Sequence, residues 1–511
     1  MTREGPSNPV VQWVGLAAAP LLAVGLYFLL PKIGGQDLTH GGKATLAAIV
    51  LMSVWWLTEA LPIEATALVP LVLFPVLGIA DIKKASAPYA DDVIYLFLGG
   101  MLLGAAMERW NLHKRFALMT IFAVGTRPDR LIAGIMIAAA AISMWVSNTA
   151  TAVMMLPIGI SIIGLVGHQV KTKRGVFGST DGNFAKAMML GIAYAATIGG
   201  IGTVVGTPPN GVAKAFIERT YGVTMSFMDW FKIGMPIMLV FLPATWFILV
   251  KVVYPVHTGK MEGVHEAIGK ELESLGKPGR GEVLTLVVFA CTSLAWVFSR
   301  QLGDALSNAI GRNIVIADSS VAIACALALF MLPVNARKRE FLLDWDTAEK
   351  IPWGVLLLFG GGLSLAAAVS ANGVDVFIGS LFSGVRVHPL ALVLIVTTVV
   401  VFATEVGSNT AIVNIFLPIV APVAVKLGVH PYLLIFPVAI GASYAYMMPT
   451  GTPPNALVFA SGHLRVADMA RPGFLLNLVS IALITVYVYF AGPVVLKFER
   501  GGSLPAAGVG K

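Results

Sequence analysis

Long apolar runs separated by short polar stretches recur along most of this chain of 511 residues. Many runs approach 20 residues, the length that a helix needs to cross roughly 30 Å of hydrocarbon. Charged residues make up 12% of the chain, about half of the usual share in soluble domains. The pattern predicts an all-α polytopic membrane protein with spans at 10–30, 44–60, 61–80, 92–108, 184–204, 231–254, 282–299, 313–334, 353–370, 431–448 and 473–492.

Two further apolar segments, 131–166 and 389–427, carry polar residues at their centres. The tetrapeptide Ser-Asn-Thr-Ala occurs at 147–150 and again at 408–411. Each arm of these segments has about 16 to 18 residues, so it can enter the membrane, stop and return. Irregular backbone at bilayer depth survives only where it is buried in protein or lines a cavity. We therefore predict two re-entrant helical hairpins with the tetrapeptide at each tip.

A second motif, Gly-Thr-Pro-Pro-Asn, also occurs twice, at 206–210 and 451–455. Glycine allows the chain to break, and proline cannot continue the preceding helix but fits the first turn of a new one. Both copies lie within apolar stretches. We expect 184–218 and 431–460 each to be a span that is interrupted near its middle.

The two motif pairs belong to a longer internal repeat. Gly-Gly at 99–100 and Leu-Pro-Ile at 156–158 recur 261 residues later, at the offset of the tetrapeptide, whereas the pentapeptide has an offset of 245. The difference corresponds to a polar insertion near 169–184. The sequence predicts one membrane domain, 1–511, that consists of a first repeat at 44–220, connecting spans and a cytoplasmic loop at 221–312, a second repeat at 313–462, and a last span and tail at 463–511.

The net charge of +8 does not indicate nucleic-acid binding, because the basic residues cluster in short loops between spans. That distribution follows the positive-inside rule. With a cytoplasmic N-terminus, the loops that fall inside are 109–130, 169–186, 255–281 and 335–352, and the C-terminus is outside. The first hairpin then opens from the cytoplasm and the second from outside, so the repeats are inverted. We expect an integral protein of the plasma (inner) membrane.

The four motifs suit the binding of an anion together with small cations. Helix N-termini attract anions, and the half-helices that end at the motifs expose carbonyl oxygens, which suit sodium. Ser143 and Thr404 lie four residues before Ser147 and Ser408, so their hydroxyls fall one turn back on the same helix face. No Lys or Arg occurs in the motifs. Because a buried dianion needs countercharge, we predict that cations bind with it.

These paired motifs resemble the divalent anion/sodium symporter family, which includes the solute carrier 13 dicarboxylate and citrate carriers. The resemblance implies a homodimer of inverted repeats that imports a C4-dicarboxylate (succinate, malate or fumarate) with co-transported sodium by an elevator mechanism, without an organic cofactor. It implies a first sodium site of Ser143, Ser147, Asn148 and Gly206, and a second of Thr404, Gly407, Asn409 and Gly451. It implies substrate contacts from Asn148, Thr149, Thr207, Asn409, Thr410, Thr452 and Pro453.

Three alternatives bear on this interpretation. Sodium-independent dicarboxylate exchange, or a citrate or sulfate substrate, is open within the same family. An enzyme would need a nucleophile with its base, or metal ligands, at bilayer depth, and the sequence has neither His-Glu-x-x-His nor Gly-x-Ser-x-Gly. Glu405 is either a proton relay or a structural hydrogen-bonding group, since it lies beside Thr404 at the second tip.

Overall fold

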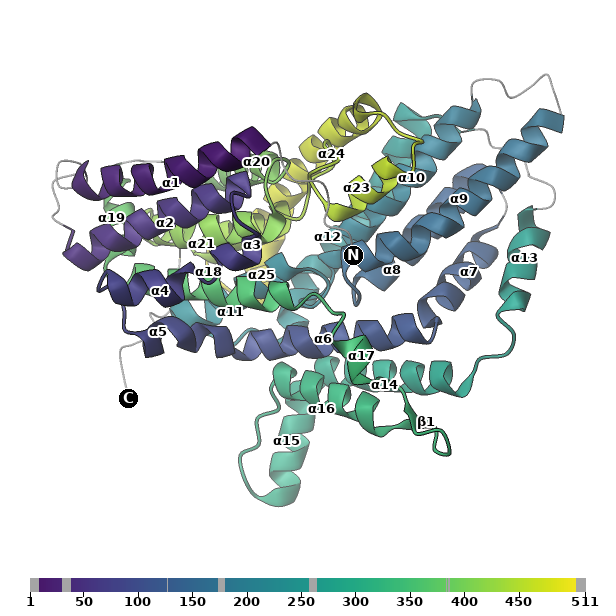
Figure 1. Ribbon diagram of the computed structural model, residues 1–511, viewed down its shortest axis with the longest axis horizontal. Helices are drawn as coiled ribbons and strands as arrows, with labels where there is room; N and C mark the ends of the chain where they lie inside the picture. Colours follow the sequence, from purple (N-terminus) through teal and green to yellow (C-terminus); the bar gives the residue numbers. More distant parts are fainter. Residues whose placement is uncertain are drawn as a thin grey trace.

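The computed structural model describes residues 9–29, 38–125, 127–172, 180–256, 264–382, 384 and 387–501, nearly all of them helical or in short turns (Figure 1). The N-terminal part contains α1 (Pro9–Leu29), α2 (His40–Thr58), α3 (Ile63–Thr66), α4 (Val69–Val76), α5 (Ile82–Ser86), η2 (Ala87–Ala90), α6 (Asp92–Arg109), α7 (Leu112–Val124), α8 (Pro128–Ser143), α9 (Asn148–Thr172), α10 (Thr180–Gly200), α11 (Pro208–Tyr221), α12 (Phe227–Phe247) and the π-helical turn η3 (Ile248–Val253).

The C-terminal part contains α13 (Val264–Ser274), α14 (Arg280–Val297), α15 (Ser299–Ile310), α16 (Asp318–Met331), α17 (Trp345–Ala348), α18 (Trp353–Ala371), α19 (Val374–Leu381), α20 (Pro389–Ala403), α21 (Asn409–Lys426), α22 (Tyr432–Gly441), α23 (Pro453–Ala460), α24 (Val466–Val486), the π-helical turn η4 (Tyr487–Ala491) and α25 (Gly492–Leu496). Between α16 and α17 lies a departure from the all-helical prediction, the antiparallel strand pair β1 (Pro333–Asn335) and β2 (Glu340–Phe341).

Eight helical runs among the described residues are long and apolar enough to cross a membrane. They are α1, α2, α14, α18, α21 and the joined runs Ile82–Arg109, Phe227–Val253 and Val466–Leu496. The span expected at 61–80 is shorter, because α3 and α4 cover only 63–76 with a turn between them. Pro70 has no N–H to donate to the carbonyl of Thr66, so one helical hydrogen bond is missing at this turn. The loops expected at 169–186 and 255–281 and the tail after 501 lie partly or wholly outside the described residues.

The helices of the two halves begin at matching positions. The pairs α6 and α18, α8 and α20, and α9 and α21 each start 261 residues apart, and α11 and α23 start 245 residues apart. Proline occupies the first turn of α8, α11, α20 and α23, where its fixed φ and missing N–H suit a helix start. A further pair, α12 and α24, starts 239 residues apart, and each helix continues into a π-helical turn. We infer that the repeats extend through these helices, past the expected limits at 220 and 462.

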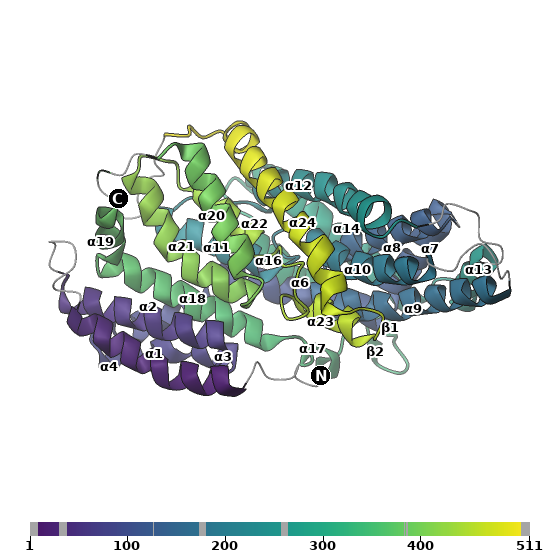
Figure 2. The ribbon, with the colours of Figure 1, turned by 90° about the horizontal axis from the view of Figure 1, so that it is seen from above.

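Each hairpin packs on both halves of the molecule (Figures 1 and 2). The hairpin α8–α9 contacts α10 of its own half and α23 of the other, and the hairpin α20–α21 contacts α22 of its own half and α11 of the other. Helix α22 is buried along its full length, and α10 is buried from residue 187 to its end. Close approach depends on small residues: a Cβ at Gly199 would lie 2.2 Å from the carbonyl oxygen of Ala140 on α8.

Candidate functional site

The first hairpin tip, residues 144–147, connects α8 to α9. The buried hydroxyl of Ser143 donates to the side-chain oxygen of Asn148 over 2.7 Å. The hydroxyl of Ser147 accepts the N–H of Ala150 at 3.2 Å and so caps α9. Ser147 is exposed and Asn148 is half-buried, so this tip presents hydroxyl and amide groups to the surface.

The second tip, residues 405–408, lies 261 residues later and repeats the pair of a hydroxyl and an asparagine oxygen, but the side chain of Ser408 does not cap α21. The buried Thr404 hydroxyl lies 2.8 Å from the side-chain oxygen of Asn409 and 2.6 Å from the carbonyl oxygen of Ala442. A hydroxyl has one hydrogen, so it can donate fully to only one of these oxygens. The other oxygen keeps its lone pairs for a different partner, and a small cation is one such partner.

The first helix break, between α10 and α11, is closed by Asn210. Its side-chain nitrogen donates to the carbonyl of Gly200 at 3.0 Å and to that of Thr203 at 2.7 Å. These carbonyls have no helical partner, because α10 ends at Gly200. Asn210 is fully buried, and its side-chain oxygen has no hydrogen-bond partner among the described residues.

The second break, between α22 and α23, is closed in the same way by Asn455. Its side-chain nitrogen donates to the carbonyls of Ala445 and Met448, both at 3.0 Å. Both acceptors lie 245 residues after their counterparts at the first break. The side-chain oxygen of Asn455 is also buried and without a partner in the part of the chain that is described. The two breaks therefore share one hydrogen-bond pattern.

Each tip is fastened to the break of its own half, but with different chemistry. In the first half the hydroxyl of Thr203 donates to the carbonyl of Met144 and accepts the N–H of Gly206 at 3.1 Å. The side chain of Asn148 lies against Gly200, where a Cβ would be 2.4 Å from its oxygen. In the second half the carboxylate of Glu405 takes the place of the Thr203 hydroxyl and accepts backbone N–H groups of residues 446–448.

The structure places all residues of the expected sites at the two tips and the two breaks. The buried ones are Ser143, Gly206, Thr207, Thr404, Gly407, Thr410, Gly451 and Thr452. The half-buried ones are Asn148, Thr149 and Asn409, and Ser147 and Pro453 are exposed. Tyr194 on α10 links the halves, because its hydroxyl donates to the carbonyl of Tyr446 at the second break over 2.7 Å. Among the described residues, no group of three or more His, Cys, Asp or Glu could hold a metal ion, so a cation here would meet mainly hydroxyl, amide and carbonyl oxygens.

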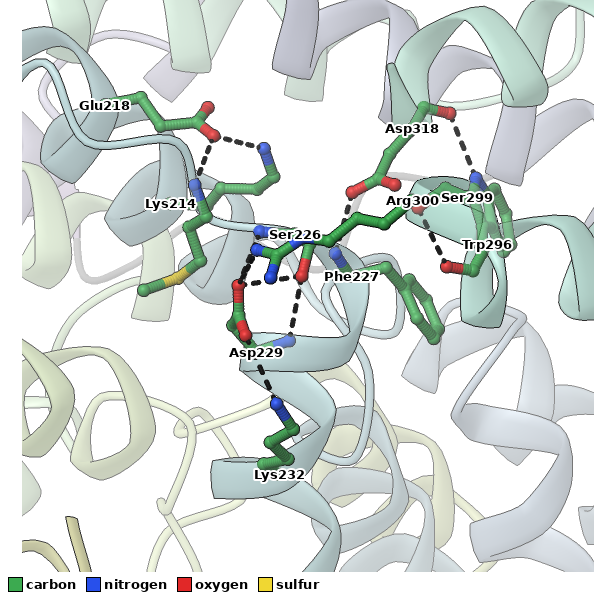
Figure 3. A network of polar contacts seen from close by, with 11 residues as sticks. Lys214, Glu218, Ser226, Phe227, Asp229, Lys232, Trp296, Ser299, Arg300 and Asp318 are labelled. Carbon is green, nitrogen blue, oxygen red and sulfur yellow. Dashed lines mark hydrogen bonds and ion pairs between the residues drawn. The ribbon is translucent and has the colours of Figure 1, made fainter. Parts of the chain in front are cut away.

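Lys214 is the lysine that follows the first break most closely in the sequence, and it is already paired. It lies on α11, about 9 Å along the helix axis from Pro208. Its ammonium group is buried and lies 2.7 Å from the carboxylate of Glu218, which also accepts the N–H of Met225 at 2.8 Å (Figure 3). The charge of Lys214 is thus compensated locally.

The same region holds a network between α12, α15 and α16 (Figure 3). Asp318 at the start of α16 accepts the N–H of Phe227 at 2.7 Å. Asp229 on α12 accepts a bond from Arg300 on α15 at 2.8 Å, and it completes a capping box with Ser226. The turn that follows the first broken helix is therefore held by polar contacts to a different part of the fold.

The roles of Asn210, Asn455 and Thr203 were missed in the sequence. The two asparagines are the last residues of the repeated pentapeptide, so the repeat itself carried the signal. Nothing in the local pattern indicated that their side chains would reach back to the preceding half-helix. Thr203 has no threonine counterpart in the second half, where the matching residue is Met448, so the repeat could not reveal it.

Comparison with known proteins identifies relatives over nearly the full length. A 506-residue stretch is 40% identical to the sodium-dependent dicarboxylate transporter SdcS of Staphylococcus saprophyticus, covering 98% of this chain and 96% of that protein. The SdcS protein of Staphylococcus aureus strain USA300 is 39% identical over 500 residues, covering 97% and 94%.

Two solved structures share the fold at low sequence identity. The YdaH transporter of Alcanivorax borkumensis matches with a TM-score of 0.56 and 15% identity, over 88% of this chain and 98% of that one. MtrF of Neisseria gonorrhoeae matches with a TM-score of 0.55 and 14% identity, over 89% and 96%. The family described as the sodium:sulfate symporter transmembrane region matches residues 11–496. The chain therefore belongs to the sodium:sulfate symporter family, a family of transporters and not of enzymes, as the resemblance to divalent anion/sodium symporters predicted.

Proposed function

We propose that this protein imports C4-dicarboxylates such as succinate, malate and fumarate, driven by co-transported sodium. The observation that carries the proposal is the duplicated pair of a buried hydroxyl and an asparagine oxygen, Ser143 with Asn148 and Thr404 with Asn409. Each pair lies next to a helix N-terminus and a helix break, which together offer donors for an anion and oxygens for a cation. The SdcS relatives, which are named sodium-dependent dicarboxylate transporters, support the same substrate class.

Sodium is assigned to two places, one in each half. The first is formed by Ser143, Ser147, Asn148 and Gly206, and the second by Thr404, Gly407, Asn409 and Gly451. Neutral oxygens alone cannot balance a dicarboxylate, so bound sodium supplies the positive charge. The carboxylates are assigned to the two shared asparagines, Asn148 and Asn409, and to four threonines, Thr149, Thr207, Thr410 and Thr452, with Pro453 beside them.

Transport is assigned to an elevator movement within a homodimer in the membrane. The hairpins pack on α10, α11, α22 and α23 of both halves, so these elements are suited to move as one body. Helices α6, α14 and α16 contact one another and belong to the remaining scaffold. The two π-helical turns that end α12 and α24 are of a kind often found at functional sites.

The decisive experiment is uptake of labelled succinate into proteoliposomes with an inward sodium gradient. We expect saturable accumulation against the succinate gradient, and we expect it to stop when choline replaces sodium. Malate and fumarate should compete, whereas citrate and sulfate should compete poorly. Uptake that persists without sodium would instead indicate exchange, and stronger competition by sulfate or citrate would change the substrate.

The site assignment is tested by Asn148→Ala and Asn409→Ala. Each variant removes one amide that the proposal places on both sodium and a carboxylate, so uptake should fall by at least about a hundredfold, as expected from losing two charge-assisted contacts. The variants should still elute as the folded wild-type species does on size-exclusion chromatography. Normal uptake by either one would contradict the assignment.

A further inference from the structure

Glu405 is a buried carboxylate surrounded by hydrogen-bond donors. Its side chain is 5% exposed. One oxygen accepts the N–H groups of Tyr446 and Met447 at 2.8 and 3.0 Å and the side-chain amide of Asn477 at 2.7 Å. The other accepts the N–H of Met447 at 3.1 Å and of Met448 at 3.2 Å. Three successive backbone N–H groups that converge in this way form a nest for an anion.

These partners define the state of the group. All of them donate, so the side chain must accept at both oxygens, which is the pattern of an ionised carboxylate. Among the described residues no Lys or Arg forms an ion pair with Glu405, so its negative charge is held by peptide and amide dipoles alone. A mobile cation that binds close to Glu405 would therefore meet one full negative charge that no basic side chain neutralises.

The carboxylate lies beside the second proposed sodium site. Glu405 directly follows Thr404 in the tip, and a Cβ built on Gly451 would be 3.2 Å from its second oxygen. Thr404 and Gly451 are both assigned to that site. At such short range, in a medium of low dielectric constant, a full charge changes cation affinity strongly.

The first half has no such charge at the matching place. Glu405 corresponds to Met144 at the 261-residue offset, and Asn477 corresponds to Met238 at the 239-residue offset of α12 and α24. These two methionine side chains lie near each other, because both reach the same point beside Gly202. A Cβ built there would lie 3.2 Å from Met144 and 3.1 Å from Met238. An apolar methionine pair in one half thus replaces a carboxylate–amide pair in the other.

We propose that Glu405 is a positioning residue that gives the second cation site a fixed negative charge, which makes it the tighter of the two sodium sites and the one filled before the dicarboxylate. The inference rests on the proposed function. It also explains why a dianion would not enter first: Glu405 repels it until sodium has neutralised the site. The side-chain amide of Asn477 donates to this carboxylate, so Asn477 helps to hold the negative charge beside the second sodium site.

The test is a sodium titration of the purified full-length protein without dicarboxylate, with choline keeping the ionic strength constant. Sodium that binds the folded state raises the melting temperature. Glu405→Gln keeps the shape of the side chain but removes its charge. The variant should therefore need at least about tenfold more sodium than the wild type for the same rise in melting temperature. Asp304→Asn, which removes a carboxylate charge at an exposed position of α15 outside both proposed sodium sites, should keep the wild-type midpoint within about threefold. An unchanged midpoint in Glu405→Gln would overturn the proposal.

Two further variants separate charge from structure. In Glu405→Gln with Asn477→Asp, one carboxylate and one amide remain but exchange places, and Glu405→Asp keeps the charge on a shorter side chain. The proposal predicts that both recover most of the sodium affinity and lower the sodium concentration for half-maximal uptake relative to Glu405→Gln. If Glu405→Gln does not fold, the two variants are compared with the wild type, whose sodium midpoint they should approach. If both lose sodium affinity as severely as the neutral variant, Glu405 has a purely structural role.

The wild-type titration distinguishes this inference from the function it rests on. A wild-type protein that shows neither a sodium-dependent melting temperature nor sodium-dependent uptake contradicts the proposed function, and the inference with it. Sodium dependence that is the same in wild type and Glu405→Gln contradicts the inference alone.

Discussion

At the scale of single residues, asparagine stabilises each buried helix break by bonding to the carbonyls that the break exposes. Each break leaves carbonyls without helical partners, and an unsatisfied buried carbonyl costs about 1 to 3 kcal/mol. Asn210 and Asn455 each bring two N–H donors on one neutral group and bond two carbonyls at once, and of these four carbonyls that of Met448 also accepts the N–H of Gly451 at 3.1 Å. A serine or threonine hydroxyl has one hydrogen and could satisfy only one. This difference explains the asparagine at the end of both pentapeptides.

A first prediction concerns Gly200, where the end of α10 meets the side chain of Asn148. A Cβ there would lie 2.4 Å from the Asn148 side-chain oxygen, so Gly200→Ala must displace the amide that the proposed site uses. Uptake should fall at least about tenfold, since a displacement of about 1 Å at a binding site has effects of this order. Gly164→Ala on α9 is the matched control, because a Cβ there meets nothing within 4 Å. Wild-type uptake in Gly200→Ala would show that Asn148 is free to move.

At the scale of elements, the parts of the fold that the sequence revealed are those fixed by local chemistry. The starts of α11 and α23 were predicted closely because a pair of prolines marks each of them, whereas α8 begins at Pro128, three residues before the expected hairpin limit. The pairing of α12 with α24 was missed, because apolar residues facing lipid can vary freely and leave no matching motif. The projecting helix α15 (Figure 1) was also missed, since it is too short and polar to register as a span. Whether and where such elements form depends on tertiary contacts, which the local sequence does not reveal. The contacts that Glu405 makes at the second tip could not be predicted for the same reason.

The two hairpin tips differ in their surroundings, which gives a second prediction. Trp145 at the first tip packs on Phe289 and Trp296, with ring centroids 5.1 and 6.1 Å apart. Its counterpart at the second tip, Val406, is 81% exposed. In a background with Cys291→Ser and Cys325→Ala, a cysteine at Val406 should react with a water-soluble maleimide about tenfold faster than one at Trp145, in line with its lack of cover.

The comparison is made on purified protein with and without sodium. Equal reaction rates at the two tips would mean that position 145 is as accessible to solvent as position 406, despite the aromatic rings that pack on the first tip. That result would contradict the asymmetry between the halves.

At the scale of the whole molecule, the polar network in Figure 3 connects α12, which packs on α8 and α10 of the proposed moving body, to α16 of the proposed scaffold. Asp318 on α16 accepts the N–H of Phe227, the first residue of α12. The proposed elevator movement would carry α12 past α16 and so break this bond. Asp318→Ala should therefore change the maximal uptake rate about threefold or more, as loss of one charge-assisted hydrogen bond allows, while sodium and succinate affinities stay within about twofold. Asp304→Ala, at an exposed position on α15, is the control.

Orientation in the membrane gives the last prediction, and it tests the inverted arrangement of the repeats. Lys338 lies exposed in the turn between β1 and β2, within a basic loop, and Arg312 lies exposed before α16. The positive-inside rule places the loop around Lys338 in the cytoplasm, so the far end of α16 must be outside. In the same cysteine-free background, a membrane-impermeant maleimide applied to intact cells should label a cysteine at Arg312 but not one at Lys338, and sealed inside-out vesicles should show the reverse. If both positions react from outside, the loop around Lys338 is outside, α18 returns the chain to the cytoplasm, and the second hairpin would then open from the same face as the first. The halves would no longer be inverted, and their two breaks could not approach one binding site from opposite sides.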